Sequence, residues 1–234
     1  MRRSSSRLGY RSPTHRAIFS RFHRPLILAL CAGVFVPLLL ASKTFEKPVA
    51  KAAVNYPAHD FHSDEKAGVA ADPYDTPEKA KIFSTNFAAH GFLPIFFVVT
   101  NDGDQPISIA NMQITLLTAD NAKLTPVSVD DLYRRLSNPQ ASTRPSPIPL
   151  PHKVKGGLSQ KERDEIESSQ FEARAVEPHT TQSGFLFFDI GGISSPLPGA
   201  AIDITGVADA KGNELLYFEI PVDKYLNAPP KTSN

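Results

Sequence analysis

The sequence contains one cysteine, no tryptophan and none of the short motifs that mark common enzyme classes. Its single cysteine, Cys31, excludes an intrachain disulfide bond and a zinc site built from several cysteines. GxSxG, GxGxxG, Walker and HExxH motifs are all missing from the 234 residues, so the signatures of hydrolases, nucleotide-binding loops and zinc proteases are absent. The histidines are scattered, and we therefore expect no catalytic residues, no cofactor and no bound metal.

Negative charge is missing from the start of the chain. No Asp or Glu precedes Glu46, whereas seven arginines precede Pro25. The whole chain has a formal net charge of +1, but subtracting those seven arginines leaves 18 Lys+Arg against 24 Asp+Glu, a net charge of −6. An acidic body lacks the clustered cations that phosphate contacts require, so we expect no nucleic-acid partner.

A run of 18 uncharged residues, 25–42, follows the arginines and ends before Lys43. A bilayer core needs about 20 apolar residues, with a range of about 17–25. The run therefore predicts one transmembrane helix, which acts as an uncleaved signal anchor. Because basic flanks stay on the cytoplasmic side, residues 1–24 are expected in the cytoplasm and the C-terminal domain outside, in the periplasm or at the cell surface of a single-pass inner or plasma membrane protein.

Two other interpretations of the N-terminus remain open. A cleaved signal peptide is the first, since Ala50-Lys51-Ala52 has the small-x-small form of a cleavage site. A mitochondrial transit segment is the second, because the first residues are rich in arginine and serine and lack acids.

Residues 43–74 are rich in Ala, Lys, Pro and Asp with little periodicity, which indicates a flexible linker. His59, His62, Asp64 and Glu65 lie within it, and imidazole and carboxylate groups are ligands that zinc takes. No helix orients this cluster, so we interpret it as a solvated part of the linker. The alternative hypothesis is a metal-dependent hydrolase that combines these residues with Asp102 and Asp104.

Three helices are predicted in the rest of the chain. The first begins at Asp75, carries Ala80, Phe83 and Phe87 on one face and ends at Gly91. A second follows Ser128, with Asp131 three residues later. The third runs from the capping box of Ser159 and Glu162 through Ser169.

Apolar and β-branched runs separated by turns predict about seven or eight strands. Residues 93–100 are apolar on both faces, which is typical of a central strand, and residues 101–104 form a turn. Phe97, Phe187 and Phe218 are expected in one core. The remaining strands are predicted at 106–110, 113–119, 124–127, 171–176, 184–190, 200–209 and 214–222.

Strands joined mostly by turns, with helices as inserts, favour a mainly β domain, an antiparallel sandwich, over residues 75–226. A long, proline-rich insert between Val129 and Gly157 interrupts it, and residues 227–234 form a disordered tail. Two segments, GFLPIFFVVTNDGD at 91–104 and EPHTTQSGFLFFD at 177–189, resemble exported bacterial immunoglobulin-like domains. That resemblance implies an immunoglobulin-like β-sandwich of the bacterial envelope, and it supplies no catalytic residues.

These observations favour a membrane-tethered extracytoplasmic module without enzymatic activity. Its partners would be the membrane, through the N-terminal helix, and a protein bound at the sandwich loops or at an edge strand. Besides the hydrolase, one further hypothesis is a small-ligand-binding protein of the envelope. Its pocket would lie between the sheet and the helix that carries Phe83 and Phe87.

Overall fold

The structure is a computed structural model that describes residues 45–137, 157–215 and 217–228. The chain divides into two compact units, Met1–Lys43 and Thr44–Asn234, and we describe the second. The predicted cytoplasmic segment 1–24, the predicted membrane helix 25–42 and the tail residues 229–234 lie outside the described residues. Within the described ranges, no helix combines the length and the apolar character needed to cross a bilayer.

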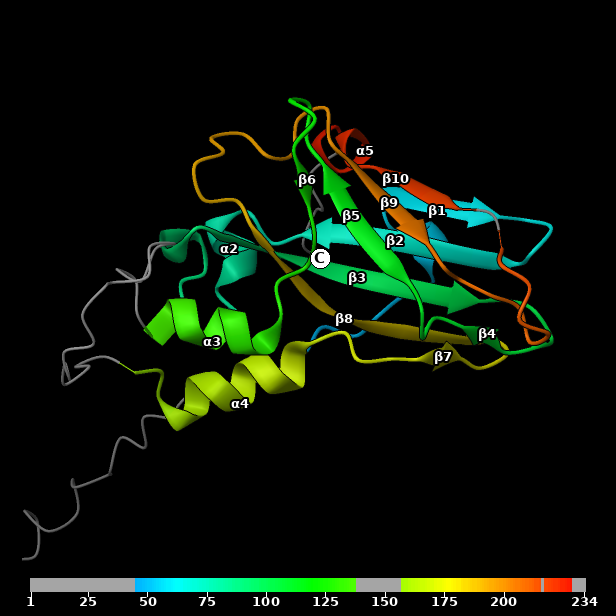
Figure 1. Ribbon diagram of the computed structural model, residues 1–234, viewed down its shortest axis with the longest axis horizontal. Coiled ribbons are helices and arrows are strands. Elements are labelled where there is room, and N and C mark those ends of the chain that lie inside the picture. Colours follow the sequence, from blue (N-terminus) through cyan, green and yellow to red (C-terminus); the bar gives the residue numbers. More distant parts are fainter. Residues whose placement is uncertain (1–44, 138–156, 216, 229–234) are drawn as a thin grey trace, which may run out of the picture. The chain divides into compact units, whose positions relative to one another are not determined.

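Antiparallel strands form two four-stranded sheets and one short two-stranded ladder (Figure 1). The mainly β, antiparallel class predicted from the sequence is therefore confirmed. The first sheet has the order β1-β2-β3-β8. Its strands are β1 (Ala58–His62), β2 (Ala67–Pro73), β3 (Phe92–Asn101) and β8 (Thr180–Asp189).

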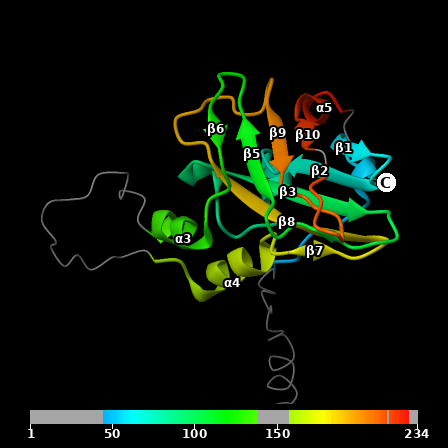
Figure 2. The ribbon, with the colours of Figure 1, turned by 45° about the vertical axis from the view of Figure 1, so that its right-hand side comes forward.

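The second sheet has the order β10-β9-β5-β6. Its strands cross over one face of the first sheet at an angle, as Figure 2 shows. The two-stranded ladder lies beside β8 (Figure 1). The strands of the second sheet and of the ladder are β10 (Phe218–Pro221), β9 (Ala201–Thr205), β5 (Gln113–Leu117), β6 (Lys123–Leu124), β4 (Ile107–Ser108) and β7 (Ala175–Val176).

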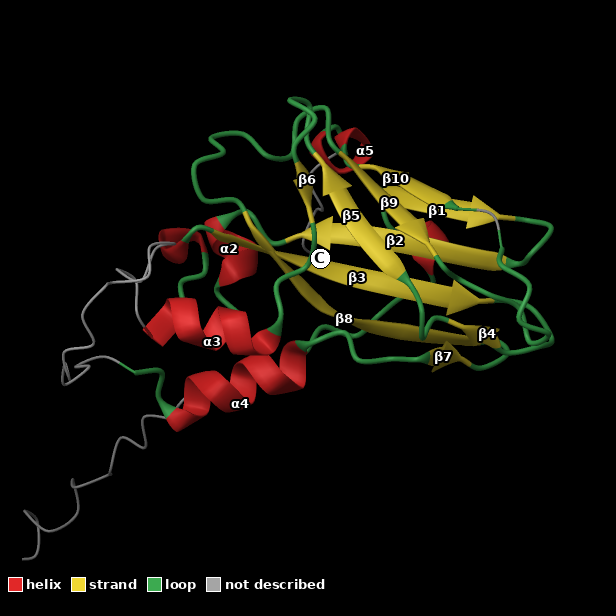
Figure 3. Cartoon of the chain, in the orientation of Figure 1, coloured by secondary structure: helices red, strands yellow, loops and turns green. Residues whose placement is uncertain are grey.

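Both faces of the first sheet are covered. One face shares an apolar core with the second sheet, to which β3 contributes Ile95, Phe97 and Val99. The opposite face of β3 packs with the helices α3 (Val129–Ser137) and α4 (Gln160–Ser169) (Figure 3). All ten residues of β3 are buried as a result, which confirms the prediction of a central strand.

The expectation that Phe97, Phe187 and Phe218 share one core is wrong for Phe187. Phe97 and Phe218 lie in the core between the sheets, whereas Phe187 lies in the core on the helix side. Successive residues of a strand point to opposite faces. On β8 the face toward the second sheet belongs to Leu186 and Phe188, so the neighbouring Phe187 must point the other way.

The expectation of a flexible linker over 43–74 is also wrong, because β1 and β2 lie within it and the domain begins well before residue 75. β2 is sandwiched between β1 and β3 and is buried along its whole length. Its small residues fit beside large neighbours: a Cβ on Gly68 would lie 2.8 Å from the ring of Phe61. Alanine and glycine are poor strand formers, which explains why composition misled the prediction.

The predicted capping box is present: Ser159 Oγ accepts from the N–H of Glu162 and opens α4, and Ser128 Oγ likewise accepts from Asp131 before α3. The helix expected from Asp75 is wrong. The chain forms only the short helix α2 (Pro77–Ala80), capped by Thr76, and later a 3-10 turn η2 (Ala88–His90).

A distant carboxylate explains why this helix stops. Both carboxylate oxygens of Glu165 lie 2.9 Å from the N–H of Ser84, and one lies 3.4 Å from the N–H of Thr85. These donors therefore point to α4 instead of to carbonyls of their own segment. Gly91 ends the 3-10 turn at φ 76°, as its glycine predicts. The 3-10 turn η1 (Ala53–Asn55) and the helix α5 (Asp223–Leu226) were not predicted from the sequence.

Candidate binding groove

The predicted histidine and carboxylate cluster is folded onto β1 and the turn after it. His62 Nε2 lies 3.3 Å from Asp60 Oδ2, and His62 Nδ1 lies 3.8 Å from Glu65 Oε2. The imidazole stacks on the ring of Phe218, with 4.1 Å between the ring centroids. His62 thus joins β1 to β10 of the other sheet.

The other residues of the metal hypothesis have other partners or face solvent. His59 Nδ1 is 2.6 Å from the carbonyl oxygen of Tyr56, and Asp64 is exposed. Asp104 pairs with Lys66 at 3.6 Å and with His179 at 3.2 Å. In the part of the chain that the structure describes, no group of three His, Cys, Asp or Glu side chains has the arrangement needed to hold a metal ion.

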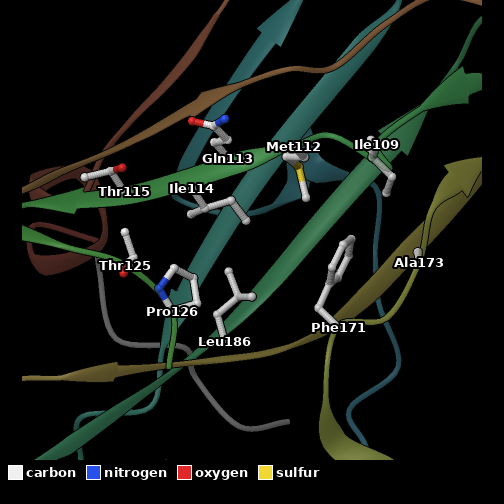
Figure 4. A pocket seen from close by; sticks show the side chains of 10 residues that line it. All are labelled: Ile109, Met112, Gln113, Ile114, Thr115, Thr125, Pro126, Phe171, Ala173 and Leu186. Atoms are coloured by element: carbon white, nitrogen blue, oxygen red, sulfur yellow. The ribbon is translucent and has the colours of Figure 1, made fainter. Parts of the chain in front are cut away.

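A groove of about 490 Å³ opens between the two four-stranded sheets, on the side of β5, β6 and β8 (Figure 4). Four short segments of chain, far apart in the sequence, contribute to its wall. In Figure 4 the side chains of Ile114, Leu186 and Phe171 surround the space from different strands and loops. The lining residues are Ile109, Met112, Gln113, Ile114, Thr115, Thr125, Pro126, Phe171, Ala173 and Leu186.

The two sheets are in contact along one pair of edges, and the groove lies on the opposite side, where the chain after β6 crosses between them. At β1 and β10 they are in contact, and Asp60 Oδ2 accepts a hydrogen bond from the N–H of Glu219 at 3.0 Å. On the opposite side β6 has only two residues, which pair with Leu116 and Leu117 of β5. The rest of β5 is therefore not covered by β6.

Main-chain hydrogen bonds close the groove at both ends. At one end the N–H of Val127 donates to the carbonyl of Phe187 at 2.8 Å, so the chain after β6 crosses to β8. At the other end the N–H of Ile109 donates to the carbonyl of Arg174 at 2.9 Å. The space is therefore a short pocket that faces solvent, and a long strand cannot run through it.

The lining is uncharged. Seven of the lining side chains are apolar, and the polar ones are Gln113, Thr115 and Thr125. No lining residue has a carboxylate, an imidazole, an amine or a thiol, which are the usual groups for acid–base or nucleophilic catalysis. The arrangement suits the binding of an uncharged molecule.

The pocket predicted beside Phe83 and Phe87 is filled by other aromatic rings. Phe83 lies 4.9 Å from Phe185 and Phe87 lies 4.8 Å from Phe187, between ring centroids. Sequence reasoning missed the real groove. One signal for it was present: Pro126 lies just after β6 and has no N–H with which to continue a ladder.

Two clusters of charged residues outside the groove have structural roles. Lys79 Nζ lies 2.5 Å from Asp72, 2.8 Å from the carbonyl of Pro73 and 3.1 Å from the hydroxyl of Tyr225, and so links α2 to α5. Burial raises the pKa of Tyr225 above its ordinary value, and the hydroxyl donates to Asp75 at 2.6 Å. The lysine is thus held by three partners.

The second cluster joins α3 to the end of β8. Arg135 forms a two-pronged pair with the carboxylate of Asp189, and its guanidinium lies 4.4 Å from the ring centroid of Phe92. The hydrogen bond from Arg135 lowers the pKa of Asp189 below its ordinary value. The N–H of Gly191 also donates to this carboxylate.

No family model, curated protein or solved structure matches this chain. The function is therefore inferred from the geometry of the groove and from the N-terminal sequence.

Proposed function

We propose that the chain is a membrane-tethered, extracytoplasmic binding module without enzymatic activity. The groove between the sheets is the observation that carries this proposal. Its volume of about 490 Å³ lies within the ~300–1,000 Å³ of typical ligand pockets. Its uncharged wall, in which seven of the ten lining residues have apolar side chains, is typical of a site that binds without reacting.

The domain is, in this proposal, a β-sandwich of immunoglobulin-like type. Two antiparallel sheets that share one core support it, since Ile202 and Ile204 of β9 pack in the same core as Ile95 and Phe97 of β3. The departure from a minimal sandwich is the helical layer of α3 and α4 on the outer face of the first sheet. A protein partner would, in this proposal, bind at the loops beside the groove, where Thr125 is exposed.

The membrane tether rests on the sequence of residues 1–42, with its seven arginines followed by 18 uncharged residues. Reporters that are active in only one compartment, fused after Asn234, test the orientation. We expect activity from the extracytoplasmic reporter alone. The N-terminal sequence of the mature protein then distinguishes an anchor from a cleaved signal peptide, and a cytoplasmic signal would overturn the tether.

Binding in the groove is tested with the full chain and a set of uncharged, fluorinated aromatic fragments, observed by fluorine NMR. We expect line broadening with several fragments. Ala173→Phe fills the groove and should remove the broadening, whereas Ala210→Phe, the same change in the exposed turn before β10, should leave it intact. If no fragment binds, or if the two variants behave alike, the groove is not a binding site.

A further inference from the structure

One main-chain donor and one acceptor are directed toward the groove from the edge of β5. β5 pairs with β9 through Gln113↔Thr205 and Thr115↔Asp203. On its other side, the N–H of Thr118 donates to the carbonyl of Ala122 at 3.0 Å in the turn to β6. In an antiparallel strand, every second residue directs both its N–H and its C=O to the same side.

That alternation determines the side of β5 to which the main-chain N–H and C=O of Ile114 point. Thr118 and Leu116 face β6, so Ile114, two residues further along, directs its N–H and C=O to the same side. Here β6 has already ended. In the described part of the chain, no strand lies beside Ile114 on that side, because Thr125 and Pro126 leave β5 and cross to β8.

The position of Ile114 makes this edge significant. The residue is only 8% exposed and lines the groove. Main-chain donors and acceptors in buried positions are almost always paired, with protein, water or a ligand. A ligand with one acceptor and one donor, spaced as in the backbone of a β-strand, can form the hydrogen bonds to the N–H and C=O of Ile114 that water forms in its absence.

We propose that the groove binds a short, uncharged peptide unit: one apolar residue flanked by an amide on each side. The N–H and C=O of that residue pair with the C=O and N–H of Ile114, as in an antiparallel ladder. Its side chain packs against Met112, Phe171 and Leu186. This inference rests on the proposed binding function and names the ligand class for the same site.

Size and charge restrict the ligand to a compact, neutral one. The main-chain bonds of Val127 and Ile109 close the two ends of the groove, so a long strand cannot extend along β5 in either direction. The lining has no charged side chain, so a free carboxylate or amine would lose part of its hydration without gaining an ion pair, which is costly. A capped single residue satisfies both conditions.

The test uses N-acetyl-leucine N-methylamide and the full chain labelled with nitrogen-15. We expect saturable shifts of the Ile114 amide signal. The matched analogue that is methylated on the leucine nitrogen keeps the apolar body but loses the donor for the carbonyl of Ile114. Because one neutral hydrogen bond corresponds to a factor of up to about ten in affinity, we expect about tenfold weaker binding of this analogue.

Two further arms complete the design. N-acetyl-leucine, with its free carboxylate, should bind more weakly than the N-methylamide by a similar or larger factor. Ile114→Pro removes the N–H without touching the pairs of Gln113 and Thr115 with β9, and proline is tolerated at an edge. This variant should bind the N-methylamide more weakly than the unmodified chain does. If Ile114→Pro fails to fold, the comparison of Ala173→Phe with Ala210→Phe tests instead whether the ligand binds in the groove.

The outcomes separate this inference from the proposed function. Equal affinity of the amide and its methylated analogue would overturn the pairing with Ile114, and equal affinity of the neutral and charged forms would overturn the restriction to an uncharged ligand. Binding of fluorinated fragments without binding of the leucine amide would overturn the inference as well, and in all these cases the groove remains a binding site. Shifts that persist unchanged in Ala173→Phe would place the ligand elsewhere and also overturn the inference.

Discussion

The two faces of the first sheet are built from the same strands but are packed to different degrees. On the helix side, Phe185 lies 4.8 Å from Tyr74, 4.9 Å from Phe83 and 5.1 Å from Phe96, between ring centroids. On the other side, the adjacent Leu186 lines the groove. One strand thus supports a closed aromatic core with one face, and with the other it contributes to the core between the sheets and to the wall of an open groove.

If the groove binds a ligand as proposed, the alternation of β8 separates side chains that mainly stabilise the fold from side chains that also contact the ligand. Aromatic side chains bury large areas and prefer the edge-to-face contacts seen here, so the helix-side core can stabilise the domain without the groove. Of the groove residues, Thr125 is exposed, whereas Ile114 and Leu186 also belong to the core between the sheets. Four sets of substitutions test this separation.

The largest effect is expected from Phe185→Ala. Phe185 is 1% exposed and contacts three aromatic rings, and such a deletion typically lowers the free energy of unfolding by about 3–5 kcal/mol. Leu186→Ala should cost less, about 2 kcal/mol, because its neighbour is an open groove and little new cavity forms. Denaturant unfolding of both variants measures the difference. Equal losses would show that the two faces are packed alike.

The sequence predicted most of the strands and helices, but it predicted less well how they pack against one another. Periodicity and capping residues identified β3, β8, the β9–β10 hairpin and both α3 and α4, because those signals are local. β1 and β2 were missed because their alanines and glycine fit only between the large side chains of other strands. The sequence did not show on which face of β8 the side chain of Phe187 lies. Both faces of β8 are apolar, so the alternation of apolar and polar residues that would distinguish them is missing.

The groove could not be predicted for a similar reason. Its wall combines β5, the chain after β6, the chain before β7, and β8, and its space depends on where β6 stops. The short α2 has a distant cause as well, since Glu165 lies about 80 residues from Ser84 and Thr85. Local sequence patterns contain neither of these relations.

The second prediction concerns Glu165, which is 2% exposed and holds the segment that carries Phe83 against α4. Glu165→Gln removes the charge and turns an amide donor toward the N–H groups of Ser84 and Thr85. We expect a loss of about 1.5–3 kcal/mol, the usual value of hydrogen bonds to a charged group.

Glu172→Gln, at an exposed position nearby, is the matched control and should stay within about 0.5 kcal/mol. Thermal and denaturant melts compare the two variants. If both behave like the unmodified chain, the aromatic core does not need this carboxylate.

The third prediction is a pH dependence at Asp189, whose pKa is lowered by the hydrogen bond from Arg135. A carboxyl group with a lower pKa in the folded than in the unfolded state stabilises the fold above its unfolded pKa, near ~3.9. That contribution is lost as the pH falls through the folded pKa.

Both side chains are partly exposed, 33% for Arg135 and 43% for Asp189, so the contribution should be under about 1 kcal/mol. Asp189→Asn should therefore lower stability slightly at neutral pH and flatten the acid limb of the stability curve. Asp120→Asn, at an exposed turn, serves as the control. An acid limb that Asp189→Asn leaves unchanged would contradict the role of this pair.

The smallest effect is expected on the groove side, from Thr125→Val. Thr125 is exposed and lines the groove, and valine keeps its shape while removing the hydroxyl, so the free energy of unfolding should change by no more than about 0.5 kcal/mol. The same substitution at Thr100 is the matched comparison. Thr100 is buried, and its Oγ1 accepts from the N–H of Ala53 at 2.9 Å.

Removing that acceptor leaves a buried donor unpaired, so Thr100→Val should cost about 1–3 kcal/mol. Because the chemical change is identical in the two variants, the difference isolates what the hydroxyl does at each place. A loss above about 1 kcal/mol in Thr125→Val would mean that the groove wall supports the fold, and the separation between a stabilising face and a binding face would then fail.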